Sequence, residues 1–224
     1  MEVAARADSE ADAHRPGRRR DPSRDAAILA AALALFEEQG YGGVSIEGVA
    51  ARAGVGKATI YRRYRDKAAL VVEAVKVGAC LDDHLPDTGD LRADLSSMLQ
   101  RMVDKLRGDN GRVLLVFAAE RLRHPELATE FERSVIGAKR AHTRRLVAGA
   151  VERGIIPAGS DVGLIAECGP ALIWHHALHG LPLTDDLADR IVDLVLPGPV
   201  NSSPVTIRPE DHRATVSGPS SAPG

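Results

Sequence analysis

Two sets of side chains in this 224-residue sequence have the residue types and spacing to do chemistry. The first is cationic and spans residues 57–65. If that segment is a helix, Ile60 and Tyr64 lie four residues apart and can face inward, which leaves basic and hydroxyl side chains outward. Arginine, lysine and hydroxyl groups are the donors that hold phosphates and reach base edges. The segment therefore predicts a nucleic-acid-binding surface.

The second set is Cys168, His175 and His179. Spacings of seven and four residues place them on one face of a helix, where sulfur and nitrogen ligands could surround Zn²⁺ or a copper ion. The alternative is that they are packing groups at a subunit seam or ligand cavity. No second dense ligand cluster occurs in the sequence, so we expect neither a metal nor another cofactor. A metal-sensing protein remains the alternative function.

Catalytic motifs are missing from the sequence. Residues 54–57, Gly-Val-Gly-Lys, lack the spacing of a phosphate-binding P-loop, and no Gly-x-Ser-x-Gly nucleophile elbow is present. Glu120 and Glu167 are single acids on expected helices, where a solvated or salt-bridged role suits them better than acid–base chemistry. The protein is therefore not expected to be an enzyme.

The cationic segment must be positioned by the elements around it. Ser45 can cap a helix that begins at residue 46, and Gly54 can end that helix in a left-handed conformation. A turn containing Val55 then leads to the cationic helix. Two helices joined by a short turn with glycine, the second of them cationic, are typical of a helix-turn-helix. An amphipathic helix over residues 23–39, closed by Gly40, would complete a three-helix platform.

This arrangement resembles the DNA-binding domain of the TetR family of bacterial transcriptional regulators. The resemblance extends over about residues 22–197 and is strongest in the first fifty. The residues that carry it are Ser45, Val49, Ala50, Ala53, Gly54, Val55, Thr59, Ile60, Tyr61, Tyr64, Lys67 and Leu70. Gly48 and Gly56 depart from the usual acidic and hydroxyl residues of the family.

The resemblance implies a role for each residue of the cationic segment. Lys57, Ala58 and Arg62 lie where base edges are read. Phosphates are contacted at Tyr61, Arg63 and Lys67, and Thr59 lies at a position that commonly meets the DNA backbone. The charge distribution also favours DNA, a polyanion, as the partner of the amino-terminal part. Residues 14–67 hold eleven Lys or Arg against six Asp or Glu, whereas residues 68–224 hold seventeen Lys or Arg against twenty-one Asp or Glu.

The rest of the chain predicts an all-α fold with four parts. These are a disordered basic arm over 1–21, a helix-turn-helix domain over 22–67, a larger helical ligand-binding and dimerisation domain over 68–197, and a disordered tail over 198–224. The longest apolar run, residues 26–36, is too short for a bilayer, and the amino-terminal residues are polar. We expect a cytoplasmic protein with no membrane partner.

Periodicity and caps predict the helices of the larger domain. Asp66 would cap a helix that reaches Leu81, with Leu70, Ala74, Val77 and Leu81 inward. Further helices are expected over 91–107, 112–122, 125–153, 161–179 and 184–196. The helix over 161–179 should be interrupted at Gly169-Pro170. The last helix should turn Leu187, Ile191, Leu194 and Val195 inward.

The carboxy-terminal part also resembles TetR-type ligand-binding domains, at 111–115, 124–127 and 181–186. The resemblance implies a homodimer that binds a palindromic double-stranded DNA operator as a transcriptional regulator, here expected to be a repressor released by a small apolar effector. The sequence does not identify the effector, the operator sequence or the regulated genes, and an activator is the alternative to a repressor. A cavity would be lined by Met98, Met102, Phe117, Trp174 and His175. The dimer interface would include Cys168, Leu172, Leu187, Ile191 and Leu194.

Overall fold

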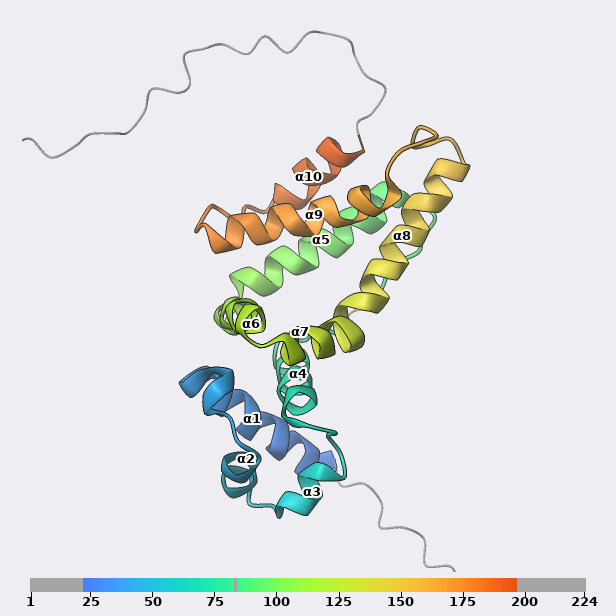
Figure 1. Ribbon diagram of the computed structural model, residues 1–224. Helices are drawn as coiled ribbons and strands as arrows, with labels where there is room; N and C mark the ends of the chain where they lie inside the picture. Colours follow the sequence, from blue (N-terminus) through green and yellow to red (C-terminus); the bar gives the residue numbers. More distant parts are fainter. Residues whose placement is uncertain (1–21, 83, 197–224) are drawn as a thin grey trace, which may run out of the picture.

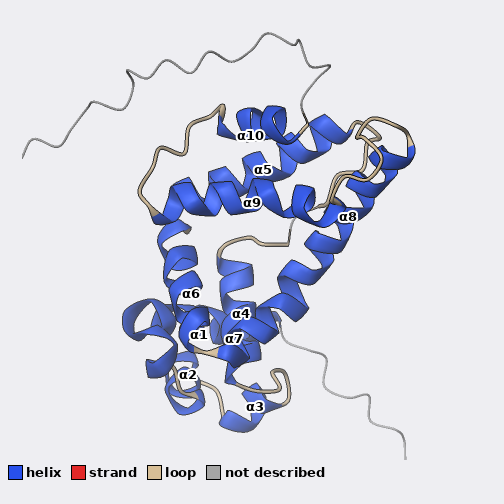
Figure 2. Cartoon of the chain, turned by 45° about the horizontal axis from the view of Figure 1, so that its top comes forward, coloured by secondary structure: helices blue, strands red, loops and turns tan. Residues whose placement is uncertain are grey.

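The computed structural model describes residues 22–82 and 84–196, and all regular secondary structure within those ranges is helical (Figure 2). The predicted all-α fold is confirmed. The helices are α1 (Pro22–Gly43), α2 (Ile46–Ala53), α3 (Lys57–Tyr61), α4 (Lys67–Gly78), α5 (Leu91–Arg107), α6 (Gly111–Arg123), α7 (Pro125–Phe131), the π-helical segment η1 (Glu132–Ile136), α8 (Gly137–Glu152), α9 (Val162–Leu178) and α10 (Leu187–Val195). The expected basic arm and tail lie outside the described residues.

The helices form two groups (Figure 1). Helices α1, α2 and α3, which we call the head, lie at one end of the molecule. Helices α5 to α10, which we call the bundle, lie at the other end. Helix α4 leads out of the head and packs against α1 and α7. It therefore connects the two groups mechanically.

Local capping in the head follows the sequence rules. The Ser45 Oγ accepts a hydrogen bond from the Gly48 amide at 3.0 Å, and Gly54 ends α2 with φ 64°. At Gly40, φ is 68° and the helix breaks as predicted, although a further helical turn continues to Gly43. One face of this amphipathic helix, formed by Ile28, Ala31, Ala32 and Leu35, is buried. These features place α3 at a fixed angle to α2.

Helix α3 is shorter than predicted. We expected a helix over 57–65, but it ends at Tyr61, and the amides of Arg63 and Tyr64 both bond to the Ile60 carbonyl at 2.9 Å. Asp66 explains the early end, because it adopts an extended conformation and its side chain accepts from the Ala69 amide at 2.8 Å as the N-cap of α4. The cap of the next helix thus prevents the cationic helix from continuing.

Helix α4 also ends earlier than predicted, at Gly78, and its buried face differs. Val77 is exposed, whereas Val71, Val72 and Val75 are fully buried beside the predicted Leu70 and Ala74. The reason is that α4 packs against both α1 and α7. A single predicted stripe therefore underestimates how much of α4 is covered.

The helix predicted over 125–153 contains a π-helical segment. The Gly137 amide bonds to the Glu132 carbonyl five residues back, and a Cβ on Gly137 would lie 3.0 Å from that carbonyl oxygen. Glycine thus relieves crowding where the helix widens. Gly154 follows α8 with φ 72°, in the left-handed conformation expected of a residue that ends a helix.

Two predictions about the last helices were wrong. Helix α9 runs without a break through Gly169 and Pro170. A Cβ at Gly169 would lie 2.9 Å from Leu99 Cδ1, so α9 packs closely on α5 at this point. In α10, Leu194 is 68% exposed and Val192 is buried instead. Helix α10 packs against α5 and α9, and that direction of packing selects the buried face.

Candidate nucleic-acid interface

Helix α3 lies at the end of the head farthest from the bundle (Figure 1). The side chains of Lys57, Ala58, Tyr61 and Arg62 are exposed there, as predicted for residues that meet DNA. Ile60 is fully buried and anchors the opposite side of the helix in the head. The fixed position of Ile60 means that the exposed side chains project from a rigid platform.

Two exposed cations at α3 make only weak contacts with the protein. Lys57 Nζ lies 2.9 Å from Glu47 Oε1, and Arg62 Nη2 lies 3.4 Å from Thr59 Oγ1. The hydrogen bond to Glu47 raises the pKa of Lys57 above its ordinary value. Exposed ion pairs contribute little to stability, so a DNA phosphate or base can replace these partners at small cost.

Arg63 and Lys67 are held more firmly than the sequence suggested. Arg63 forms an ion pair with Asp25 of α1, and its Nη1 donates to the Thr59 carbonyl at 3.3 Å. Lys67 Nζ donates to the Tyr41 carbonyl at 3.0 Å and lies 4.0 Å from the centre of the Tyr41 ring. Both cations therefore brace α1.

Tyr41 belongs to the contact between head and bundle. Its amide donates to Glu120 Oε2 of α6 at 2.9 Å, and its ring lies 4.7 Å from that of His124. Burial, with a smaller effect from the charge of Glu126, raises the pKa of Tyr41 to about 12. Sequence reasoning did not identify Tyr41, because its partners are distant in the chain.

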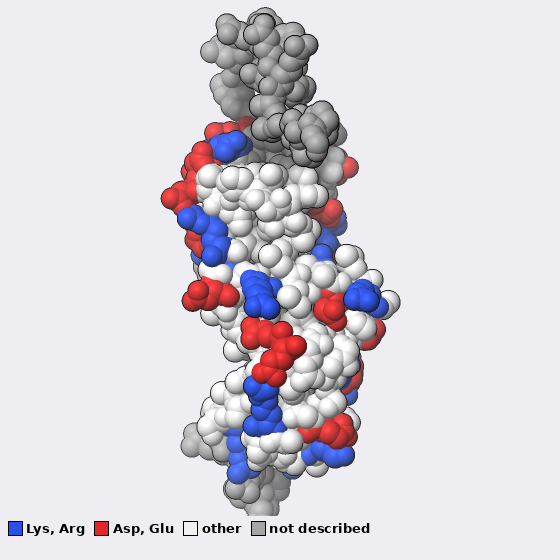
Figure 3. All heavy atoms as spheres, turned by 90° about the vertical axis from the view of Figure 1, so that its left-hand side faces the viewer, with Lys and Arg blue, Asp and Glu red and all other residues white. Residues whose placement is uncertain are grey.

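The bundle carries an uncharged outer face (Figure 3). This surface extends across the upper part of the molecule, at the level of α9 and α10. The large hydrophobic residues exposed on these two helices and the loop between them are Leu164, Leu178, Leu181 and Leu194. Large apolar side chains exposed on neighbouring helices are candidates for an interaction site.

The predicted dimer residues divide into two groups. Leu194 is exposed, and Cys168 and Leu172 are half-buried on α9. Leu187 and Ile191, by contrast, are covered by this chain itself. The prediction did not include Leu164 and Leu178. Their three- and four-residue spacing with residues 168, 171 and 175 places them on the same helix face as Cys168, and this spacing could have identified them.

The five residues predicted to line an effector cavity lie on α5, α6 and α9. Met98, Met102 and Trp174 are half-buried in the bundle, and His175 is exposed. Phe117 is 2% exposed, and its ring centre lies 6.0 Å from that of Phe36 and 4.8 Å from that of Phe131, at the junction of α1, α6 and α7. A cavity of about 250 Å³ lies elsewhere and is lined by Asp87, Gly89, Leu91, Asp94, Arg145, Leu146 and Arg153.

The possible metal ligands can be placed in the same way. The rings of His175 and His179 lie with centres 4.5 Å apart on α9. Across residues 22–82 and 84–196, no three His, Cys, Asp or Glu side chains converge in a way that could hold a metal ion. Within the same ranges, none of the helices has both the length and the apolar character needed to cross a membrane.

A three-helix head with an exposed cationic third helix, joined to a helical bundle, defines a helix-turn-helix DNA-binding protein. Comparison with known families agrees. The model of the bacterial regulatory proteins of the tetR family matches residues 28–74, and the model of the tetracyclin repressor-like C-terminal domain matches residues 85–195. The chain belongs to the TetR family of DNA-binding transcriptional regulators.

Three relatives illustrate the similarity. The DNA-binding transcriptional repressor TetR of Mycobacteroides abscessus is 32% identical over 188 residues, which cover 79% of this chain and 94% of the relative. An uncharacterized HTH-type transcriptional regulator of Mycobacterium tuberculosis is 30% identical over 189 residues, which cover 82% of this chain and 93% of the relative. The crystal structure of FadR from Bacillus subtilis in complex with stearoyl-CoA has a TM-score of 0.61 and 19% identity, covering 77% of this chain and 98% of FadR. The two curated relatives are named as transcriptional regulators rather than as enzymes.

Proposed function

We propose that this protein is a repressor that binds a palindromic operator as a homodimer and is released by a small, mainly apolar effector. The observation that carries the proposal is the exposed cationic surface of α3 on a rigidly anchored head. One helix of five residues is a small reading surface. Two heads related by a two-fold axis would read both halves of a palindrome. Selection of DNA fragments by the purified protein tests this directly, and enrichment of a non-palindromic site would contradict it.

Within the interface we assign two kinds of contact. Lys57, Ala58 and Arg62 would read base edges, because they are exposed on or directly after α3. Phosphates would be held by Tyr61, Arg63 and Lys67, and Thr59 would meet the DNA backbone. The second group includes the two cations that brace α1, so phosphate binding would also stabilise the head.

Arg62→Ala should weaken binding of the selected operator by about 1–3 kcal/mol and relax the preference at one base pair, if Arg62 bonds to a guanine. Fluorescence anisotropy with the selected operator and its single-base variants measures both effects. Arg107→Ala is a matched control, since Arg107 pairs with Asp185 in the bundle. If Arg62→Ala lowered the affinity for all sequences equally, Arg62 would contact phosphate and would not read a base.

Lys67→Ala should weaken all sequences about equally and flatten the salt dependence of binding by about one unit of slope. The same change removes the contact with the Tyr41 carbonyl, so a modest loss of thermal stability should accompany it. Titrations at several salt concentrations separate the two roles. If stability fell while the slope stayed at the wild-type value, Lys67 would be a brace of the head and not a phosphate ligand.

The effector would bind inside the bundle and change the spacing of the two heads. FadR, with stearoyl-CoA in its crystal structure, supports an acyl-CoA as a first probe for this fold. A coupled effector should lower operator affinity by about 1–3 kcal/mol, and operator should weaken effector binding by the same factor. Titration of stearoyl-CoA with and without operator measures this coupling. If stearoyl-CoA bound with the same affinity in the presence and absence of operator, it would be excluded as the effector.

A metal assay of the purified protein tests the alternative of a metal sensor.

A further inference from the structure

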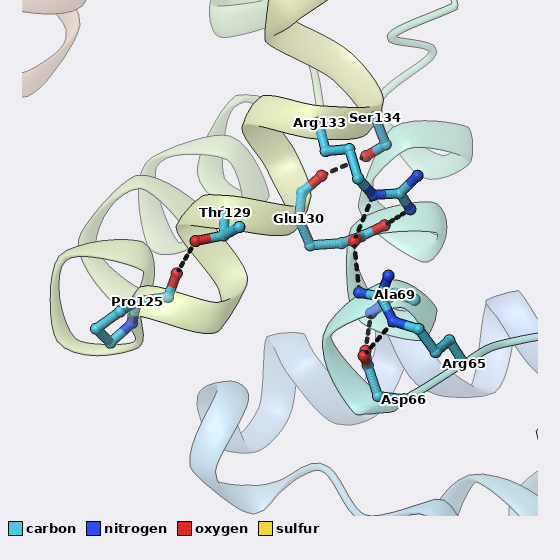
Figure 4. Close-up of polar contacts among 8 residues, drawn as sticks. All are labelled: Arg65, Asp66, Ala69, Pro125, Thr129, Glu130, Arg133 and Ser134. Carbon is cyan, nitrogen blue, oxygen red and sulfur yellow. Dashed lines mark hydrogen bonds and ion pairs between the residues drawn. The ribbon is translucent and has the colours of Figure 1, made fainter.

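We propose that Glu130 is a positioning residue, which fixes the angle of the head on the bundle through Arg65. This inference rests on the proposed function, because the angle is that at which two heads meet a palindrome. Glu130 belongs to α7 and Arg65 follows α3, sixty-five residues earlier in the chain. Figure 4 shows both side chains reaching toward each other between the two groups of helices.

The Glu130 carboxylate is shared between two arginines. Its Oε2 accepts from Arg65 Nη2 at 3.0 Å and from Arg133 Nε at 3.0 Å, and its Oε1 accepts from Arg133 Nη2 (Figure 4). Glu130 is only 4% exposed. A buried carboxylate is costly unless it is paired, so both arginines are held toward it.

Arg65 transmits this contact to the head. Its Nε donates to Asp66 Oδ2 at 2.8 Å, and Asp66 in turn caps α4 through the Ala69 amide. That amide bond is the main cause of the lowered pKa of Asp66. A single guanidinium therefore joins the first turn of α4, directly after the cationic segment, to α7.

On the bundle side the contact meets the π-helical segment. Arg133 belongs to η1, and Ser134 Oγ donates to the Glu130 carbonyl at 2.7 Å. A π-helical turn inside a longer helix is a local departure from α-helical register and often occurs at functional sites. A movement of α8 would therefore shift Arg133 and Glu130 before it reached Arg65.

Glu130 lies on α7, away from the exposed face of α3, so its loss should change the freedom of the head and not its DNA contacts. A palindrome requires the two recognition helices at a fixed separation. A loosened head would sample more angles and would lose more orientational freedom when both half-sites are occupied. The affinity for the whole palindrome should therefore fall, while the affinity for one half-site should not change.

The test is Glu130→Gln, which keeps the shape of the side chain and removes its charge. Affinity for the palindrome selected by the wild-type protein should fall about tenfold, a change expected when a charged hydrogen-bond partner is lost. The salt slope should remain at the wild-type value, because no phosphate contact is removed. Palindromes with one base pair inserted or deleted at the centre should be discriminated less well than by the wild type.

Glu132→Gln is the matched control, because Glu132 pairs with Arg140 within the bundle and should leave all these values unchanged. The double variant with Arg65→Ala should lose little more than the larger of the two single variants, as expected for partners in one contact. If Glu130→Gln fails to fold, Arg65→Gln provides the same spacing test and leaves Glu130 paired with Arg133.

The outcomes separate this inference from the proposed function. If the wild-type protein selects a palindrome, and Glu130→Gln binds it with wild-type affinity and discriminates against its spacing variants as strongly as the wild type does, the positioning role is overturned and the proposed function stands. A loss that is equal on the half-site, or that comes with a flatter salt slope, also overturns it. If the wild-type protein selects no palindrome, the proposed function fails, and this inference fails with it.

Discussion

Replacement of Leu178 and Leu194 together by glutamate should convert a dimer into monomers and lower operator affinity by about a hundredfold or more. Both side chains are largely exposed, Leu178 at 60% on α9 and Leu194 at 68% on α10, the two helices that we propose form the dimer face. In a dimer that buries this face, the new carboxylates would be desolvated without partners. A monomer would then lose the avidity that comes from two linked heads. Sedimentation velocity gives the mass, and anisotropy gives the affinity.

Two controls make this result specific. Leu122→Glu places the same charge on α6, at a residue that is 84% exposed, and should leave the dimer intact. Ile191→Glu should destabilise the fold itself, because Ile191 is buried within one chain. Wild-type protein that sediments as a monomer yet binds the palindrome tightly would contradict the proposed dimer.

Phe117→Ala should lower the free energy of unfolding by about 3–5 kcal/mol, the range for a large aromatic residue removed from a packed core. Phe117 lies between Phe36 of α1 and Phe131 of α7, so the head and the bundle share this cluster. The melting temperature should fall by roughly 10 °C for a domain of this size. Urea and thermal unfolding, followed by circular dichroism, measure both quantities.

The same variant distinguishes two roles for Phe117. A residue that lined an effector cavity would mainly enlarge the cavity when truncated, and its coupling with Phe36 would be small. A residue of the junction should show non-additive losses with Phe36→Ala or Phe131→Ala, because contacting residues share their stabilisation. Leu122→Ala, on an exposed side chain, should change stability by less than about 0.5 kcal/mol. An unfolding free energy at the wild-type value would exclude the junction role.

The helix caps of the head could be predicted from the sequence, because the interactions that determine them are local. Ser45 and Asp66 each cap a helix through an amide three residues ahead, and Gly54 ends a helix by its own left-handed conformation. Such contacts depend only on neighbours in the chain. The same locality made the exposed positions of Lys57 and Arg62 readable from the spacing of Ile60.

Partners far apart in the chain could not be predicted. Arg63 pairs with Asp25, Lys67 binds the Tyr41 carbonyl, and Arg65 reaches Glu130, at separations of 38, 26 and 65 residues. Sequence patterns identify a basic residue as outward but do not show which helix will pass beside it. Three residues expected to act mainly on DNA or solvent therefore also hold the fold together.

The bundle shows the same limit for burial. Its helices are rich in apolar residues on more than one side, so periodicity alone does not say which side a neighbour covers. The sequence by itself determined the all-α class, the head and its family. Only the tertiary packing of α10 on α5 and α9 decided that Val192 is buried and Leu194 exposed. Only the approach of α1 to α6 and α7 placed Phe117 at the junction, because burial is decided by whichever surfaces meet in space.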